Sequence, residues 1–142
     1  TQASLGALIT RPKLTDALLS RPPFRFLHDI VIEVVKVTGF AQGLYDEMES
    51  QSQNIKDKDS KVAFLQKIVD CVSFALGVRI PIRPSKVVAG LEPESTNLFL
   101  QRLASAASDP NVDGAAAAQR VLAGETTAVK VARAEEGGAA VA

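Results

Sequence analysis

The fold is decided by the stretch RPPFRFLHDIVIEVVKVTG at residues 21–39. Pro22 and Pro23 suit the entry to a helix and Gly39 suits its end, so we expect a helix over residues 23–38. On a helical wheel the charged side chains share one arc of about 80°, and apolar side chains cover more than half of the circumference. This pattern is typical of a helix that packs against several neighbours, so we expect it in the centre of a helical bundle.

The same periodicity predicts two further long helices, at about residues 58–76 and 93–107. In the first of these, five polar side chains are expected to face water: Asp59, Gln66, Lys67, Asp70 and Ser73. Shorter helices fit residues 2–9, 15–19, 85–89 and 113–123. Strand signals are nearly absent, because the alternation at 78–82 is interrupted by proline. The sequence therefore predicts an all-α fold, a compact helical bundle.

One domain is expected at residues 1–125, followed by a flexible Ala/Gly-rich tail or linker at 126–142, where bulky apolar residues stop. The chain begins at Thr1 without a methionine and ends in a Gly/Ala run, which suggests a piece of a longer protein. No stretch has the roughly 18 uninterrupted apolar residues of a membrane helix. With no secretory leader and a single cysteine, we expect a cytosolic location and no membrane insertion.

Composition excludes several classes of function. The 142 residues hold 16 Lys and Arg against 16 Asp and Glu, a balance that argues against a nucleic-acid module, since such modules carry a basic excess. One cysteine and one histidine exclude a disulfide framework, most zinc sites and any catalytic triad that does not use His28. No glycine-rich phosphate loop occurs. We therefore expect no enzyme activity, no metal and no cofactor.

The residues that chemistry could use each have a simpler interpretation. His28 stands at the margin of a polar arc and is expected to be a structural or surface residue. Cys71 lies on an apolar helix face and is expected to be packed and unreactive. Asp57 and Asp59 fit a helix start, where carboxylates favour the positive end of the dipole. The acidic residues of YDEMES at 45–50 fit a polar loop.

Charge is distributed unevenly along the chain. Residues 1–91 hold 12 Lys and Arg against 9 Asp and Glu, whereas residues 92–142 hold 4 against 7. Two local basic clusters supply the candidate binding residues: Arg11, Lys13, Arg21, Arg25, Arg79, Arg83 and Lys86. If the fold brings the clusters together, they form a patch that attracts an acidic protein surface; otherwise they are separate solvated charges. Ile32 and Leu98, both predicted to face outward, are candidate apolar contacts or surface strays.

Four runs of the sequence resemble a known family: RPPFRFLHDIVIEV at 21–34, TGFAQGLYDEMES at 38–50, NIKDKDSKVAFLQKIVD at 54–70 and PSKVVAGLEPESTNLFLQRL at 84–103. The family comprises the intraflagellar transport complex B subunits that are also described as microtubule-interacting proteins and carry an N-terminal calponin-homology domain. The resemblance covers about residues 1–125. It implies an all-α, calponin-homology-like fold.

The resemblance also implies a function. It points to a non-enzymatic module that binds tubulin or microtubules in the cytoplasm, cilium or flagellum and basal body, with a basic patch against acidic tubulin surfaces or tails. Other complex B subunits are implied as partners of regions outside this chain. A second interpretation is a module that docks another transport or signalling subunit without touching tubulin. Actin binding is a third, although the absence of tryptophan departs from typical calponin-homology domains.

Overall fold

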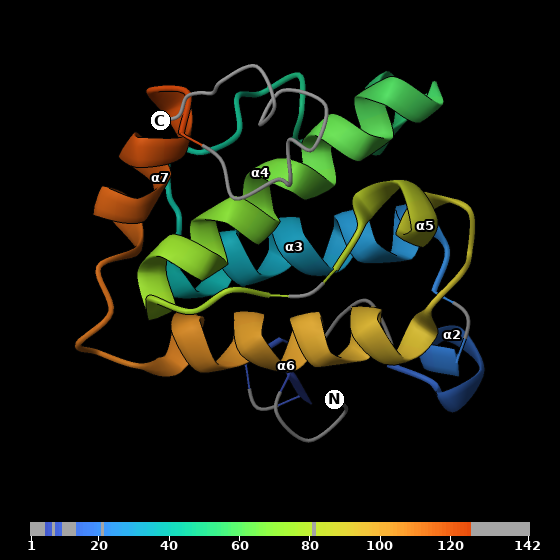
Figure 1. Cartoon of the computed structure of the whole chain (residues 1–142), viewed down its shortest axis with the longest axis horizontal. Helices are drawn as coiled ribbons and strands as arrows, with labels where there is room; N and C mark the ends of the chain where they lie inside the picture. The colour runs from blue at the N-terminus through green and yellow to red at the C-terminus, as the bar shows by residue number, and fades with distance from the viewer. Residues whose placement is uncertain (1–4, 7, 10–13, 21, 81, 126–142) are drawn as a thin grey trace, which may run out of the picture.

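Three long helices frame the molecule: α3 at Phe24–Thr38, α4 at Lys58–Leu76 and α6 at Pro93–Ser108. In this computed structural model all three begin at the same end, on the right in Figure 1. The shorter elements are α2 at Asp16–Ser20, η1 at Ser52–Asn54, α5 at Pro84–Val88 and α7 at Gly114–Leu122. The structure describes residues 5–6, 8–9, 14–20, 22–80 and 82–125, and this part of the chain contains no strand.

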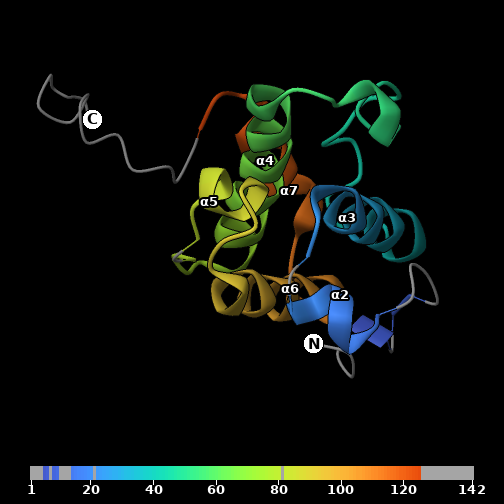
Figure 2. The same ribbon diagram turned by 90° about the vertical axis from the view of Figure 1, so that its right-hand side faces the viewer.

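Helices α4 and α6 connect the bundle. Helix α4 packs against α5, α6 and α7, and α6 also contacts α2 and α3. Figure 2, which views the molecule from the end where the long helices begin, shows α5 and α3 on opposite sides of α4 and α6. Side chains that point outward from α5 and from α3 therefore leave the interior in different directions.

Local signals fix the helix ends. Asp57 accepts a hydrogen bond from the Ser60 N–H and caps the start of α4, and Gly77 ends the helix with a φ of 68°. Gly39 ends α3 in the same left-handed conformation, and its N–H bonds to the Val35 carbonyl. The predicted bounds of α4 are confirmed, and those of α3 and α6 agree to within one residue.

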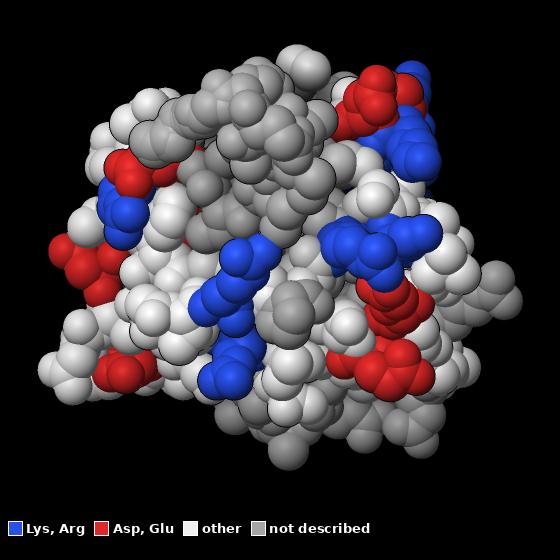
Figure 3. Space-filling model, in the orientation of Figure 1, with Lys and Arg blue, Asp and Glu red and all other residues white. Residues whose placement is uncertain are grey.

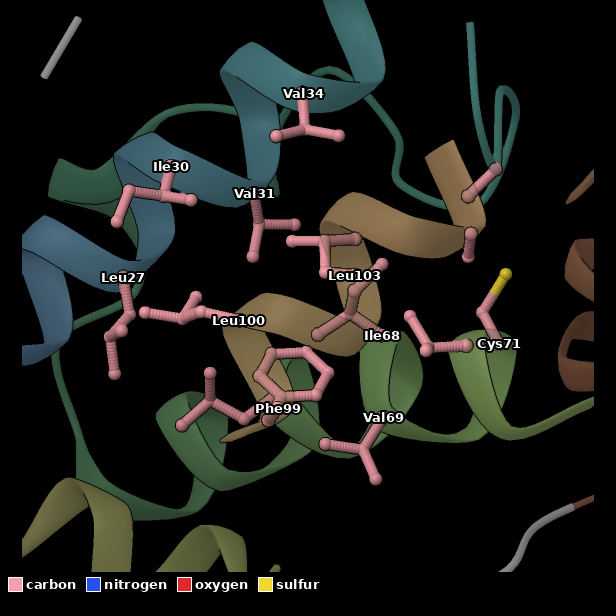
Figure 4. Packing of buried hydrophobic residues seen from close by; sticks show 14 of the residues in the cluster. Leu27, Ile30, Val31, Val34, Ile68, Val69, Cys71, Phe99, Leu100 and Leu103 are labelled. Atoms are coloured by element: carbon pink, nitrogen blue, oxygen red, sulfur yellow. The ribbon is translucent and has the colours of Figure 1, made fainter. Parts of the chain in front are cut away.

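The core lies where α3, α4 and α6 meet (Figure 4). Its central side chains are buried: Leu27, Ile30, Val31 and Val34 of α3, Ile68, Val69 and Cys71 of α4, and Phe99, Leu100 and Leu103 of α6. Burying each large apolar side chain contributes about 1.5–3 kcal/mol. This burial confirms that the helix read from residues 21–39 is central and that the fold is all-α.

Two predictions about α4 are wrong. Asp70 and Ser73 were expected to face water, yet both are buried, with exposed fractions of 2% and 3%. The Gln66 side-chain amide donates to the Asp70 carboxylate at 2.8 Å. The wheel could not show this burial, because α5, α6 and α7 together surround more of α4 than its apolar arc indicates.

Helix α3 departs from its wheel at two positions. Val37, one of the apolar residues of this helix, is 53% exposed, whereas Ile32, predicted to face outward, is half-buried against the core. A wheel treats every turn alike, but neighbours cover only part of a helix's length. Leu98 of α6 is exposed as predicted.

Some predictions fall outside the described residues. They are the tail at 126–142 and most of the helix at 2–9. Among the described helices, none combines the length and the apolar character needed to cross a bilayer.

Candidate functional site

The first basic cluster is represented by Arg25. Its other three members, Arg11, Lys13 and Arg21, lie outside the described residues. Arg25 is exposed in the first turn of α3, and Lys61 of α4 stands close by, with its Nζ 5.7 Å from the centre of the Phe24 ring. The sequence analysis missed Lys61, because only the packing of α4 on α3 reveals its place beside this cluster.

The second basic cluster is partly neutralised. Arg79 is exposed after the end of α4, and Lys86 is half-buried on α5. Arg83, which lies between them in the sequence, forms an ion pair with Glu92 at the start of α6. On the face of the molecule drawn in Figure 3, Lys and Arg lie in separate groups, some of them bordered by Asp and Glu.

The described members of the two clusters do not meet. Lys61 and Gly77 mark the two ends of α4, which at 1.5 Å per residue lie about 24 Å apart. Arg25 belongs with the first end, and Arg79 follows the second. Lys86 lies on α5, across α4 and α6 from α3 (Figure 2). The described cations therefore form two basic surfaces, one at the start of α3 and one along the α4–α5 connection.

The histidine belongs to a structural aromatic cluster of Phe24, His28, Tyr45 and Phe64. His28 is buried, its Nε2 donates to the Glu49 carbonyl at 2.9 Å, and its ring stacks on Phe64 at 4.7 Å. On the other side of Phe64, the Tyr45 ring stacks at 4.2 Å and its hydroxyl donates to the Phe64 carbonyl. Burial raises the pKa of Tyr45 well above its ordinary value. The structural interpretation of His28 agrees with this packing.

The carboxylates of the 45–50 loop also hold structure. Asp46 accepts from the Glu49 N–H, and Glu49 accepts in return from the Asp46 N–H. The second oxygen of Glu49 pairs with Lys67 of α4 at 2.7 Å. These contacts fix the loop against α4 and account for two of its acidic residues without catalysis.

Cys71 is packed, as expected. It is fully buried, and its Sγ lies 3.9 Å from the Gly114 carbonyl oxygen. Burial raises the pKa of the Cys71 thiol to about 12, so almost no thiolate exists at neutral pH. Among the described residues, no three His, Cys, Asp or Glu side chains gather in a way that could hold a metal ion.

A hollow opens at the C-terminal end of α4. It measures about 360 Å³ and is lined by Ser73, Phe74, Gly77, Val78, Arg79 and Arg120. Arg120 comes from α7, and its guanidinium lies 4.0 Å from the centre of the Phe74 ring. The sequence analysis missed Arg120, because no local pattern indicates that α7 delivers it beside Arg79.

Fold and surface together define a class: an all-α, calponin-homology-like domain that presents basic surfaces. The family described as "Microtubule-binding protein MIP-T3 CH-like domain" matches residues 1–109, and the chain belongs to this family. The family is thus described by what it binds and not by a reaction.

Curated relatives agree with this assignment. TRAF3-interacting protein 1 of Danio rerio is 50% identical over 125 residues. The proteins of the same name from Rattus norvegicus and Mus musculus are 48% and 47% identical over the same length. Each alignment covers 88% of this chain but only 19–20% of the relative, so the chain spans about a fifth of their length. The resemblance found in the sequence is confirmed.

Proposed function

We propose that this domain is a non-enzymatic tubulin-binding module of an intraflagellar transport protein. It works in the cytoplasm and cilium, including the basal body. The observation that carries the proposal is membership of a family described as microtubule-binding. Other complex B subunits are partners of regions that lie outside this chain.

The contact residues are the cations of the two sequence clusters: Arg11, Lys13, Arg21, Arg25, Arg79, Arg83 and Lys86. Arg25 and Arg79 are exposed, and Lys61 adds a charge beside Arg25. Cations in these positions attract acidic tubulin surfaces or tails and steer their approach. Arg83 contributes least, because Glu92 already holds its guanidinium.

The free energies of exposed ion pairs make a single domain a weak tubulin binder. An exposed ion pair contributes about 0.2–1 kcal/mol and is screened by salt. Six such contacts yield a few kcal/mol, whereas micromolar affinity needs about 8 kcal/mol. Many copies on one transport particle would raise the effective concentration enough for a tether.

Co-sedimentation with microtubules at increasing salt tests the proposal. Two double variants separate the surfaces: Arg21→Glu with Arg25→Glu, and Arg79→Glu with Lys86→Glu. The matched control, Lys36→Glu with Arg102→Glu, makes the same change in net charge at exposed positions that belong to neither cluster. We expect one or both test variants to lose most binding and the control to keep it.

Binding should also fall when the acidic tails are removed from tubulin. If the control loses as much microtubule binding as both test variants, the loss would reflect the change in net charge and not a specific surface. Binding that survives both double variants and tail removal would contradict the basic-surface mechanism. Circular dichroism of each variant confirms that it is folded.

The second candidate is docking of another transport or signalling subunit without tubulin contact. The name of the relatives, TRAF3-interacting protein 1, favours this alternative. A pull-down from ciliary extract distinguishes the two. Recovery of a stoichiometric protein partner without tubulin would support docking and count against tubulin binding.

A further inference from the structure

The hollow between α4 and α7 has the features of a binding site that the basic surfaces do not require. Among the six described residues that line it, two are arginines and none is acidic. Phe74 and Val78 give it an apolar wall. Its volume of about 360 Å³ lies at the small end of ligand sites, which suits one or two side chains rather than a nucleotide.

A buried hydroxyl in this wall lacks a partner. Ser73 is 3% exposed, and its Oγ makes no hydrogen bond among the described residues. Buried polar atoms are nearly always hydrogen-bonded, so this unpaired hydroxyl marks a place where the wall is imperfectly packed. The Ser73 carbonyl, by contrast, already accepts from the N–H groups of Gly77 and Val78.

Arg120 indicates the kind of ligand that the hollow fits. Its Nε and Nη2 both donate to one carboxylate oxygen of Glu125, at 3.0 and 2.8 Å. The Glu125 N–H bonds to the Arg120 carbonyl, so the end of α7 holds this carboxylate beside the Arg120 guanidinium. Both side chains are about half exposed, and an exposed pair of this kind exchanges readily for another carboxylate.

We propose that the hollow binds a glutamate side chain from an acidic peptide segment of a partner protein. The incoming carboxylate replaces that of Glu125 on Arg120, and Arg79 supplies a further donor. The glutamate methylenes rest on Phe74 and Val78. A carboxylate is chosen over a phosphate because Glu125 already occupies the arginine in this way.

This inference does not rest on the proposed function. The hollow shares Arg79 with the second basic surface, but Arg120 belongs to neither surface. Arg102, exposed on α6, belongs to neither surface and does not line the hollow, so it serves as the matched probe. Arg120→Gln should weaken peptide binding, and Arg102→Gln should leave it unchanged.

The experiment titrates the folded 142-residue chain with an acetylated, amidated peptide of sequence GEEGEEG and follows backbone amide shifts by NMR. The control peptide replaces each glutamate with glutamine. We expect shifts at Gly77, Val78, Arg79 and Arg120 with the acidic peptide alone. Shifts centred on the start of α3 instead, equal shifts with both peptides, or no shifts would overturn the proposal.

Variants then test the individual roles. Arg120→Gln should weaken binding by up to about fivefold, because an exposed ion pair is lost. Ser73→Ala should leave binding unchanged, because the hydroxyl is covered, while the melting temperature stays level or rises, since the unpaired hydroxyl is gone. Glu125→Gln should strengthen binding by removing the internal competitor. Unchanged affinity in Arg120→Gln, or weaker binding in Glu125→Gln, would contradict the assignment.

A peptide with phosphoserine in place of the glutamates tests the choice of anion. Binding more than about tenfold tighter than that of the glutamate peptide would overturn the carboxylate assignment. Microtubule co-sedimentation of the same variants keeps the two proposals separate. Loss of peptide binding in Arg120→Gln with no microtubule binding by any form supports the hollow and defeats the proposed function. Microtubule binding with no peptide effect of Arg120→Gln does the reverse.

Discussion

The two ends of helix α4 are packed in opposite ways, one by large aromatic rings and the other by small residues. At its N-terminal half, Phe64 is enclosed by the rings of Phe24, His28 and Tyr45. At its C-terminal half the neighbours are small, since Cys71 faces Gly114 and the adjoining turns of α7 present alanines. Large rings fill space completely, whereas small residues let backbones approach closely and leave a hollow where they end.

Polar groups follow the same division. Around the aromatic cluster, the His28 imidazole and the Tyr45 hydroxyl both have partners. At the other end, the Ser73 hydroxyl has none among the described residues, and two arginines face one hollow. The difference teaches that the aromatic end provides stability, and that the small-residue end is where the fold leaves room for a ligand.

The largest effect should come from Phe64→Ala. Removing a ring that three others contact leaves a cavity, and such changes cost about 3–5 kcal/mol. Phe74 lies near the other end of the same helix and is only half-buried, so Phe74→Ala is the matched control and should lower the free energy of unfolding clearly less. Urea denaturation of both variants measures the difference. Equal losses would remove the distinction between the two ends.

Gly114→Ala should come next. A Cβ at this position would lie 2.6 Å from Phe40 Cδ1 and 2.9 Å from the Ala41 backbone nitrogen. Because the second contact is with backbone, α7 must shift, at a cost of about 1–3 kcal/mol. Ala116→Gly, on the exposed side of α7, should cost only the intrinsic helix preference of about 1 kcal/mol. A neutral Gly114→Ala variant would show that α7 is loosely seated.

This comparison also explains which features could be read from the sequence. The bounds of α4 were predictable because both ends carry strong local signals, Asp57 as cap and Gly77 in the left-handed conformation. The core of α3 was predictable because its apolar arc is continuous. Such features depend on neighbours along the chain, which a sequence displays directly.

The features that escaped depend on neighbours in space. Asp70 and Ser73 are buried because three helices surround α4. Arg83 is paired because Glu92 reaches it from the start of the next helix. Arg120 joins Arg79 only because α7 docks at the end of α4. Charge bias along the chain therefore identified basic segments but not the surfaces that they form.

Alkaline pH offers a test of the small-residue end. Burial raises the pKa of Cys71 from 9.0 to about 12, so between these values the unfolded chain releases a proton that the folded chain retains. The contribution to stability is complete below pH 9 and is lost as the pH rises toward 12. At pH 10 the loss is about 1 kcal/mol.

Cys71→Ala removes this dependence. Its free energy of unfolding should decline less than that of the parent chain between pH 8 and pH 10.5, as measured by urea denaturation. Tyr45 also has a raised pKa, but it is present in both proteins and cancels. Parallel curves would mean that solvent reaches the thiol.

The smallest effect belongs to the cap of α4. The Ser60 hydroxyl and the Ser60 N–H both donate to the Asp57 carboxylate and lower its pKa below 3.8. A lowered pKa stabilises the folded chain above pH 3.8, and this contribution disappears as the pH falls through the lowered value. Asp57→Ala should therefore melt at a lower temperature than the parent chain at pH 7, with the gap closing toward pH 2. Asp57→Asn, which keeps an acceptor but no charge, should lie between them.

Because Asp57 is exposed, its loss should fray only the first turn of α4 and leave the Phe64 cluster intact. The near-ultraviolet circular dichroism should therefore not change. A collapse of that signal would mean that the aromatic end depends on its cap as well as on its rings.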